Sequence, residues 1–579
     1  MPVLVTARNA AWSDGYTGYL YRRILDRTDN SWLLSSVDLP SSVSTLPEPP
    51  SFATLGRRVY ITGMFSNLLV VAEDEKCYKA GIEAPTAAPT VVAGTGGVTD
   101  TCLCYISFVQ KIDALDVAES NLSPATTLTL ASQGRTWTLP TSTLDPHVTH
   151  IRGYVSANGD LPRRAFEATI GTAAFTENVP TSTLALHPSY YNNGADPVDD
   201  NGVAPYAKYA KVFNKRLFLA GDPQHPYRLW YSELNRPTAF GIDSYFDTRG
   251  RESITGLGVH GTNLIVFCNW ATYVLQGWTD GSEGIVPDMR LDPLISGIGC
   301  VSHWSVVDIN KRLWYAAEDG IRIFDGGFNY MMKDLRTYWA TNYAANVAAY
   351  KQSVGVDDKV NHCYVLLIPR TSGGAFHYVA NYLDTDPAVG GSGLQPAWSV
   401  DTKARTEYTL GSLVDEDGIQ RWYSGGSDGY IRENDIATDA DDDGDSDAKL
   451  IDIITKHYID GQPGLTVDEG KNLTRFFTQI ESESQAHTVS VYAGPEAAGD
   501  QLAPNWTQSP AANAKTYDPG DGTSRVAVAD ARFAFLPSGC SGEGWTFRFQ
   551  ATSATDFKFR GFSGEYGPGK CTRGFSALA

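Results

Sequence analysis

Short apolar segments with the same polar opening recur along the chain. Each begins with a turn residue and two basic residues and continues through aliphatic, aromatic, apolar and small positions. Such a run is short enough to be a buried strand. Three copies align without gaps: GRRVYITG at 56–63, NKRLFLAG at 214–221 and NKRLWYAA at 310–317. Looser copies are TNLIVFC at 262–268, NHCYVLLI at 361–368 and GIQRWYSGG at 418–426. The pattern predicts six similar strands.

Turn signals and a second apolar run follow these strands. Glu318-Asp319-Gly320 precedes IRIFDGG, and Ser427-Asp428-Gly429 precedes YIREND. Asp-Gly between two apolar runs is a strong hairpin signal. Hairpins repeated every few tens of residues indicate stacked or radial repeats, and with sheet in each unit a β-propeller is expected. We predict an all-β fold, an irregular β-propeller of about six blades.

A segment of different character separates the first copy from the second. It opens with APTAAPTVVAGTGG and continues with the strand-like runs CLCYISFV and TTLTLAS. We predict a fibronectin-III-like β-sandwich at 86–190, inserted into the propeller. An insertion at a blade loop disturbs little when its two ends lie close together. Residues 1–85 then form the first blade or blades, and 191–436 form the remaining ones.

The composition shifts again after residue 436. IATDADDDGDSDAKL is acidic and is followed by alternating runs such as NLTRFFTQIES and EGWTFRFQATS. We predict that 437–579 comprise an acidic linker and a C-terminal β-sandwich or barrel domain.

Composition supports the all-β interpretation and restricts the function. The chain has 30 Tyr and 13 Trp but 5 Met, with 55 Gly and 30 Pro, which favours strands and tight turns. Its formal net charge is −20, so it has no whole-chain basic footprint for gripping nucleic acid. Acidity serves solubility, and it also suits a surface past which DNA slides without sticking.

Cysteines and hydrophobic runs give no sign of a metal site or a membrane anchor. The eight cysteines are scattered and include no CxxC pair, so we expect free buried thiols and no zinc. Cys102 and Cys104 are two residues apart in a strand and share a face. No window approaches the roughly 20 apolar residues of a membrane span, and the opening residues show no signal peptide. We expect a soluble protein made in a cytoplasm, with no cofactor.

An acidic run gives the best partial match to a metal motif. Asp439, Asp441 and Asp443 with Gly444 form D-x-D-x-D-G, the first half of an EF-hand calcium loop. The twelfth position is Leu450, where a bidentate Glu is required, although Asp445 and Asp447 offer further oxygens. We favour a solvated linker without metal.

Catalytic motifs are weak. Residues 425–429 match G-x-S-x-G, but a strand follows where a hydrolase needs a helix. His147 and His150 form HVTH in a β-rich segment, not HExxH on a helix. No carboxylate pair stands out. The basic doublets Arg57-Arg58, Lys215-Arg216 and Lys311-Arg312 open strands, where pairing with Asp and Glu is favoured over a nucleic-acid contact ring. We expect no enzymatic activity.

The order of these segments resembles a family of viral proteins. AESNLSPATTLTL at 118–130 and HIRGYVS at 150–156 lie in the insert, which follows YKAGIEAP at 78–85. NKRLFLAGDPQHPYRLWYSELNRPTAF, LIVFCNWATYVLQGW and NKRLWYAAEDGIRIFDGG come after it. This order, over roughly 50–436, resembles the propeller-bearing tail proteins of tailed bacteriophages, especially tail tube or nozzle proteins of short-tailed phages. It is similar also to phage packaged-DNA stabilisation proteins.

The resemblance implies a structural virion protein without catalytic residues. Such proteins form a ring, commonly sixfold, below the portal and adaptor, and they continue the channel through which DNA leaves. Expected partners are further copies of the chain in a homohexameric ring, adaptor and portal proteins, tail fibres, and passing double-stranded DNA. The expected location is the virion tail.

Two further hypotheses follow from charge and aromatic content. A ring of acidic chains repels DNA phosphates, so Asp439, Asp441, Asp443, Asp445 and Asp447 are candidate channel-lining residues. The alternative is a carbohydrate-binding or carbohydrate-degrading propeller, because Trp and Tyr faces stack on sugars. Quaternary structure separates the two hypotheses.

Overall fold

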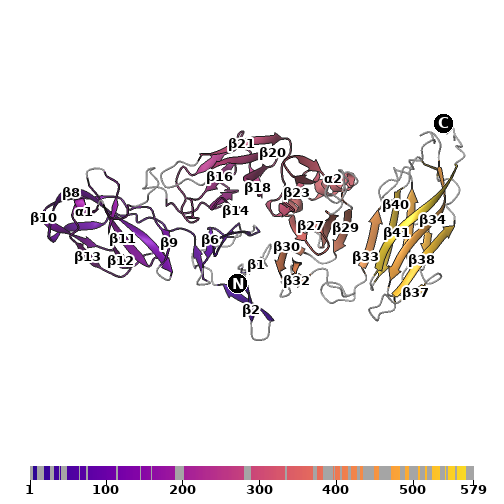
Figure 1. Ribbon diagram of the computed structural model, residues 1–579, viewed down its shortest axis with the longest axis horizontal. Coiled ribbons are helices and arrows are strands. Elements are labelled where there is room, and N and C mark those ends of the chain that lie inside the picture. The colour runs from indigo at the N-terminus through magenta and orange to yellow at the C-terminus, as the bar shows by residue number, and fades with distance from the viewer. Residues whose placement is uncertain are drawn as a thin grey trace. The chain divides into compact units, whose positions relative to one another are not determined.

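The computed structural model divides the chain into two compact units (Figure 1). The first contains residues 1–330 and 350–354, and the second contains residues 331–349 and 355–579. The structure describes residues 4–8, 19–26, 31–37, 40, 49–63, 65–72, 76–112, 115–143, 145, 147–157, 160–184, 186–189, 201–278, 288–332, 335–369, 374–382, 396, 398–403, 407–414, 419–426, 431–433, 449–454, 471–482, 489–494, 506–508, 515–517, 525–534, 541–542, 546–553 and 557–568.

Four antiparallel sheets of four strands, each in sequence order, follow one another in the first unit. Sheet 1 has β4 (Ser51–Leu55), β5 (Arg58–Thr62), β6 (Leu69–Val71) and β7 (Cys77–Lys79). Sheet 2 has β14 (Tyr209–Phe213), β15 (Arg216–Ala220), β16 (Arg228–Tyr231) and β17 (Tyr245–Asp247). Sheet 3 has β18 (Ile254–His260), β19 (Asn263–Cys268), β20 (Ala271–Trp278) and β21 (Asp288–Ser296). Sheet 4 has β22 (Val307–Ile309), β23 (Arg312–Ala317), β24 (Gly320–Phe324) and β25 (Phe328–Tyr330).

The recurring Asn-Lys-Arg opening is a hairpin turn. Asn214 and Lys215 have φ of 44° and 60°, and Asn310 and Lys311 have φ of 52° and 63°. Two central residues with positive φ define a type I′ turn, whose twist matches that of the flanking strands. Phe213 pairs with Arg216 across the first of these turns. The sequence motif therefore marks where the first strand of a sheet turns into the second.

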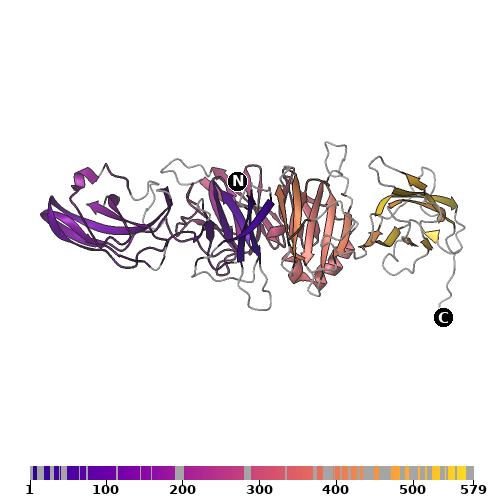
Figure 2. The same cartoon turned by 90° about the horizontal axis from the view of Figure 1, so that it is seen from below.

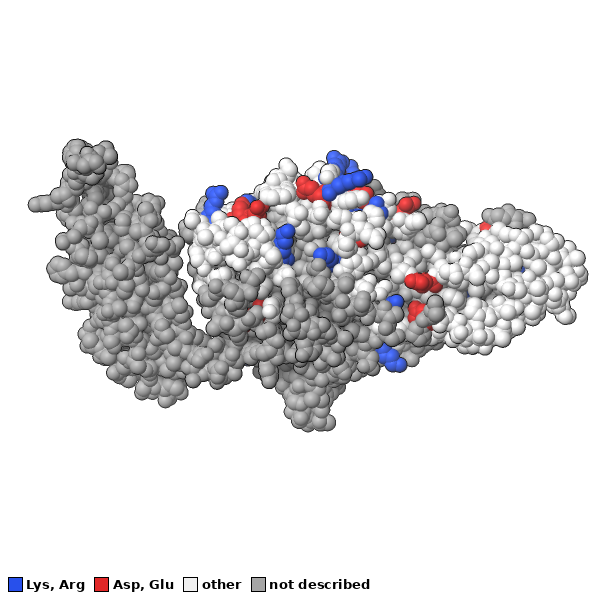
Figure 3. All heavy atoms as spheres, turned by 180° about the vertical axis from the view of Figure 1, so that it is seen from behind, with Lys and Arg blue, Asp and Glu red and all other residues white. Residues whose placement is uncertain are grey.

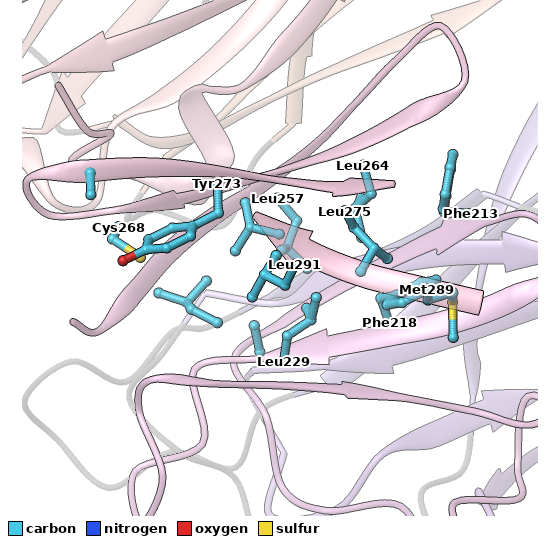
Figure 4. Packing of buried hydrophobic residues seen from close by; sticks show 14 residues of the cluster. Phe213, Phe218, Leu229, Leu257, Leu264, Cys268, Tyr273, Leu275, Met289 and Leu291 are labelled. Atoms are coloured by element: carbon cyan, nitrogen blue, oxygen red, sulfur yellow. The ribbon is translucent and has the colours of Figure 1, made fainter. Parts of the chain in front are cut away.

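The second strands of sheets 2 and 3 are buried on both faces, one face against each neighbouring sheet. In β15, Leu217 and Leu219 join an apolar cluster with residues of sheet 1. Phe218 and Ala220, which alternate with them, join a cluster with residues of sheet 3. Figure 4 shows this second cluster, in which Phe218 and Leu229 of sheet 2 lie opposite residues of sheet 3. Side chains alternate between faces along a strand, so one apolar run supplies both interfaces.

The same alternation continues into sheet 4. Leu264 and Val266 of β19 face sheet 2, whereas Ile265 and Phe267 pack with Leu313 and Tyr315 of β23. The glycine that ends the first repeat permits a further close contact between sheets 1 and 2. Gly63 has a φ of 87°, and a Cβ there would lie 2.4 Å from the carbonyl oxygen of Pro49. Its N–H donates to Ala207 O at 3.1 Å.

The inserted domain lies between sheets 1 and 2 in the sequence and is built on long strands (Figure 2). It has one continuous sheet in the order β12-β11-β8-β10-β13, with β9 paired to β8. Its elements are β8 (Thr90–Ile112), β9 (Leu115–Glu119), β10 (Thr126–Thr138), β11 (His150–Ala157), β12 (Arg163–Thr169), β13 (Ala174–Glu177) and α1 (Thr181–Leu184). An apolar cluster that includes Cys104, Trp137 and Ile151 fills its interior. The expected two sheets of a sandwich are here joined through the shared strands β8 and β10, whose pairing shifts register beyond Ala131.

The remaining described strands of the first unit precede sheet 1. They form a three-stranded antiparallel sheet of β1 (Leu4–Arg8), β2 (Tyr19–Asp26) and β3 (Ser31–Val37).

The second unit contains two more sheets of the repeat and a C-terminal pair of sheets. The repeat sheets are β26 (Val354–Asp358) with β27 (Cys363–Pro369), β28 (Ala375–Asn381) and β29 (Trp398–Lys403), then β30 (Glu407–Val414) with β31 (Gln420–Gly426) and β32 (Ile431–Glu433). Helices α2 (Arg336–Ala345) and α3 (Val347–Tyr350) precede them in the chain.

The C-terminal strands form two sheets. One contains β33 (Lys449–Ile454), β40 (Thr546–Ser553), β35 (Val489–Gly494) and β36 (Trp506–Gln508). The other contains β37 (Lys515–Tyr517), β38 (Arg525–Ala534), β34 (Lys471–Ser482), β39 (Ser541–Gly542) and β41 (Phe557–Pro568).

The fold class predicted from the sequence is confirmed. The chain is all-β and propeller-like, with blade-type meander sheets in series, a β-insert between the first and second sheets, and C-terminal β-sheets. In the described part of the chain, six such sheets follow one another from Ser51 to Glu433.

The type I′ turn at Lys215 yields a test of the repeat. A left-handed conformation costs a residue with a side chain roughly 1–2 kcal/mol, and β-branching adds to that cost. Because Lys215 already carries the left-handed cost, we expect Lys215→Gly to be at least as stable as the wild type. We expect Lys215→Val to be less stable by on the order of 1 kcal/mol, since only the β-branching is added. Thermal and urea unfolding of the whole chain measure both. Arg57 is the matched control, because it holds the second turn position of sheet 1 without a positive φ, so Arg57→Val should cost less. Equal losses at the two positions would contradict the turn assignment.

Candidate functional site: the inner strands of the first unit

The first strand of each sheet in the first unit lies against the first strand of the next. Strand β4 contacts β14, β14 contacts β18, and β18 contacts β22. These inner strands are the part of a blade-type sheet that lies nearest the axis of a propeller. Ligands of propellers commonly reach the protein near this axis, so we consider the inner strands the first candidate site.

A short 3₁₀ helix bridges all of these strands. Element η1 (His303–Ser305) precedes sheet 4 in the chain. His303 Nδ1 accepts a hydrogen bond from Leu257 N of β18 at 3.2 Å. The other ring nitrogen must then carry the proton, and it lies 3.1 Å from Ser51 Oγ of β4. The Tyr209 ring of β14 packs on the imidazole, with 4.8 Å between the ring centroids.

Ser51 and Trp304 extend the network. Ser51 Oγ accepts from Ala210 N at 3.1 Å and lies 3.4 Å from Ala210 O. Trp304 Nε1 donates to Pro50 O at 2.9 Å. One 3₁₀ turn thus hydrogen-bonds to sheet 1, across about 250 positions of the chain, and to sheet 3. It contacts sheet 2 through the Tyr209 ring.

The electrostatics of this network favour a neutral imidazole. Burial, with a smaller contribution from the nearby Lys211 ammonium, lowers the pKa of His303 to about 3. Burial also lowers the pKa of Lys211, while Asp308 of β22 acts in the opposite direction. A neutral His303 with both ring nitrogens engaged cannot activate Ser51 as a nucleophile. The Ser51–His303 pair therefore joins the sheets and is not a catalytic dyad.

The sequence-predicted candidates lie elsewhere. Asp439, Asp441, Asp443, Asp445 and Asp447 lie outside the described residues, as does Ser427 of the G-x-S-x-G match. His147 Nδ1 lies 3.0 Å from Asp145 Oδ1, and His150 Nδ1 lies 2.9 Å from Thr149 Oγ1. In the described part of the chain, no group of three or more His, Cys, Asp or Glu side chains is placed to hold a metal ion. No helix among the described residues is long and apolar enough to cross a membrane.

The two residues of the basic doublet Lys215-Arg216 differ in their surroundings. Lys215 is exposed in its turn, whereas Arg216 is buried beneath sheet 2. Arg216 Nη1 donates to Ser232 O at 2.8 Å and lies 3.7 Å from Glu233 Oε2. The predicted pairing with carboxylates is thus present at Arg216. Sequence reasoning missed His303 and Ser51, because neither belongs to a recurring motif. The HWS tripeptide at 303–305 matches no known motif, and nothing in the sequence around Ser51 marks it.

Comparisons with known proteins add little to this description. No family model and no curated protein matches the chain. Among solved structures it is similar to two crystal structures of BBS1N in complex with ARL6DN. The mercury-soaked structure has 9% identity and a TM-score of 0.23, over 74% of this chain and 90% of that chain. The lead-soaked structure has 11% identity and a TM-score of 0.20, over 74% and 89%. Likeness at such TM-scores carries no argument about function.

The buried neutral His303 predicts how stability depends on pH. Its folded pKa lies below its ordinary value of 6.5, so the unfolded chain binds a proton that the folded chain excludes. The contribution of His303 is complete above pH 6.5 and falls by roughly 1.4 kcal/mol per pH unit as pH drops from there towards 3. We expect urea unfolding at pH 8 to give the wild type a clearly larger free energy of unfolding than His303→Gln. At pH 5 the difference between the two free energies should be smaller. His260→Gln, outside the network, is the control. A gap that does not change with pH would contradict a neutral buried His303.

Proposed function

We propose that the protein is a structural component of a bacteriophage tail, a nozzle or tube ring below the portal and adaptor. The observation that carries the proposal is the order of parts. One blade-type sheet is followed by a long-stranded β-insert, and further blade-type sheets and a C-terminal β-domain come after it. This is the order in which the segments that resemble propeller-bearing tail proteins occur in the sequence. Localisation in the virion tail belongs to the same proposal.

The inner strands favour a conduit between chains over one within a chain. His303 and Trp304 cross from the start of sheet 4 to the first strand of sheet 1. Tyr209 packs against both rings. A DNA duplex cannot run along strands that are joined in this way. In the proposal, the channel is enclosed by several copies of the chain, and we take six as the expected number.

Net charge supports a conduit that DNA passes without adhering. The formal charge of −20 per chain gives a hexamer about −120 in total. Sequence-independent DNA binding depends on Lys and Arg that neutralise phosphates, and an acidic wall lacks this attraction. Asp439, Asp441, Asp443, Asp445 and Asp447 remain our candidates for lining or bordering the channel.

The carbohydrate-binding alternative gains no support from the aromatic residues. The large rings in the second strands of sheets 2 and 4 are buried: Phe218, Trp314 and Tyr315 are each at most 1% exposed. Among the described residues, only Phe52, Trp270 and Tyr408 are aromatic and more than a third exposed. Sugar stacking needs accessible rings, and in the described part of the chain only these three reach that exposure.

Quaternary structure tests the proposal directly. We expect the purified full-length chain to assemble into closed rings with a central hole, visible by negative-stain microscopy, and analytical ultracentrifugation should give a mass near six copies. A monomer that binds glycans on an array would favour the carbohydrate alternative and overturn the ring.

Channel charge is tested by neutralising the acidic segment. In particles that carry the protein, replacing the five aspartates named above by asparagine should slow DNA release or leave particles jammed, because phosphates are then repelled less. DNA release followed by fluorescent dye measures the effect, with an equal number of Asp→Asn changes at exposed positions such as Asp243 and Asp319 as the control. Unchanged release kinetics would count against these residues as channel lining.

A further inference from the structure

The inserted domain presents an outer face that is rich in threonine and free of charge. The face spans three neighbouring strands, β8, β10 and β13, and its residues are exposed or partly exposed. We call it the threonine face; it consists of Thr90, Val92, Thr99, Thr101, Thr127, Thr129, Thr136, Thr138, Ala174 and Thr176.

Strand register brings these residues together. Thr136 pairs with Val92 on one side and with Thr176 on the other. Thr101 and Thr129 are also paired, and their hydroxyl oxygens lie 3.1 Å apart. The register shift beyond Ala131 changes which residues of β10 point outward, from odd to even numbers. The irregularity thereby keeps threonines on the outer face along the whole strand.

The charged side chains that neighbour the threonine face in these strands, those of Asp100, Arg135 and Glu177, point the other way. Lys111, near the far end of β8, lies outside the face and pairs with Glu167 and Asp116. Arg135 is fully buried, and its guanidinium lies 2.9 Å from both Asp100 Oδ2 and Glu177 Oε1. Burying three ionisable groups costs free energy unless they are paired, as they are here. In Figure 3, the inserted domain, at the right-hand end of the view, shows almost no Lys, Arg, Asp or Glu side chains.

We infer that the threonine face is a contact surface between copies of this chain. The inference rests on the proposed ring and names part of its seam. Each copy carries a formal charge of −20, so copies repel one another wherever acidic surfaces approach. A charge-free face is where identical copies can meet with the smallest electrostatic cost. We therefore assign a second copy of the chain as the occupant, because that copy is equally acidic and also avoids repulsion by offering its uncharged face.

The residue types suit packing between sheets. Threonine and valine are β-branched and hold one main rotamer, so little side-chain entropy is lost when the face is covered. The face carries none of the three exposed aromatic residues, which makes sugar stacking a poor alternative. Three strands about 4.8 Å apart and some ten residues long give on the order of 500 Å² per partner. This is below the roughly 800 Å² of a standard stable interface, so the contact is weak alone and gains strength from ring closure.

Charge placed on the face tests the inference. We compare the wild type with the double variant Thr129→Lys/Thr136→Lys as full-length chains, using sedimentation velocity over a hundredfold range of concentration and negative-stain microscopy. Both sites are on the outer side of the sheet, and circular dichroism and thermal unfolding check the fold. The control is Thr169→Lys, an exposed threonine of β12 outside the face. We expect the double variant to need at least tenfold more protein for assembly, while the control assembles like the wild type.

Two outcomes would overturn the inference, and they differ in what they say about the ring. If the folded double variant forms the same rings at the same concentration as the wild type, the face is not part of the seam, and the proposed ring stands. That result would indicate that the threonine face binds a different protein or a glycan. If the wild type stays monomeric throughout, the proposed ring fails and the inferred seam fails with it.

Discussion

Burial of both faces of one strand is the constraint on which the first unit depends. All five residues of β15 are buried, and its four apolar residues, 217–220, pack alternately against sheet 1 and sheet 3. A four-stranded sheet with two apolar faces cannot exist alone in water, because each face needs a cover. The cover is the next sheet, which has the same property, so the sheets must follow one another in series. The sequence repeats for this reason. The same short apolar run supplies apolar side chains to both faces of a strand in one sheet after another.

Apolar packing between sheets does not fix how one sheet is oriented against the next. The hydrogen bonds at the inner strands fix this orientation. The hydrogen bonds of His303 and Trp304 reach sheets 1 and 3 with fixed geometry, which apolar contacts alone do not impose. Burying the imidazole carries a cost that is offset by its two hydrogen-bonding partners and by its remaining neutral. The same bridge closes off the inner strands, and for this reason the proposed conduit is assigned to the space between chains.

Charge is distributed unevenly on this acidic protein. In the inserted domain, Arg135, Asp100 and Glu177 form a buried cluster, whereas the residues of the threonine face on the same strands are threonine, valine and alanine. An interior carrying ions beneath a neutral exterior reverses the usual arrangement of a half-buried sheet. Selection for solubility alone would place the charges outside. The reversal is explained if that exterior is covered by another copy, and it links the inserted domain to the ring that the acidic chain is proposed to form.

Local patterns in the sequence are sufficient to predict the strands and the all-β class. Alternation and turn chemistry act over a few residues, so the NKR turns, the strands after them and the all-β class could be read from segments such as 214–221. The sequence did not reveal the Ser51–His303 bridge, because its partners are 252 positions apart and neither belongs to a recurring pattern. Nor did it reveal the threonine face, since the register shift beyond Ala131 decides which threonines point outward. Such long-range contacts and register depend on the packing of whole sheets, and only the tertiary structure decides them.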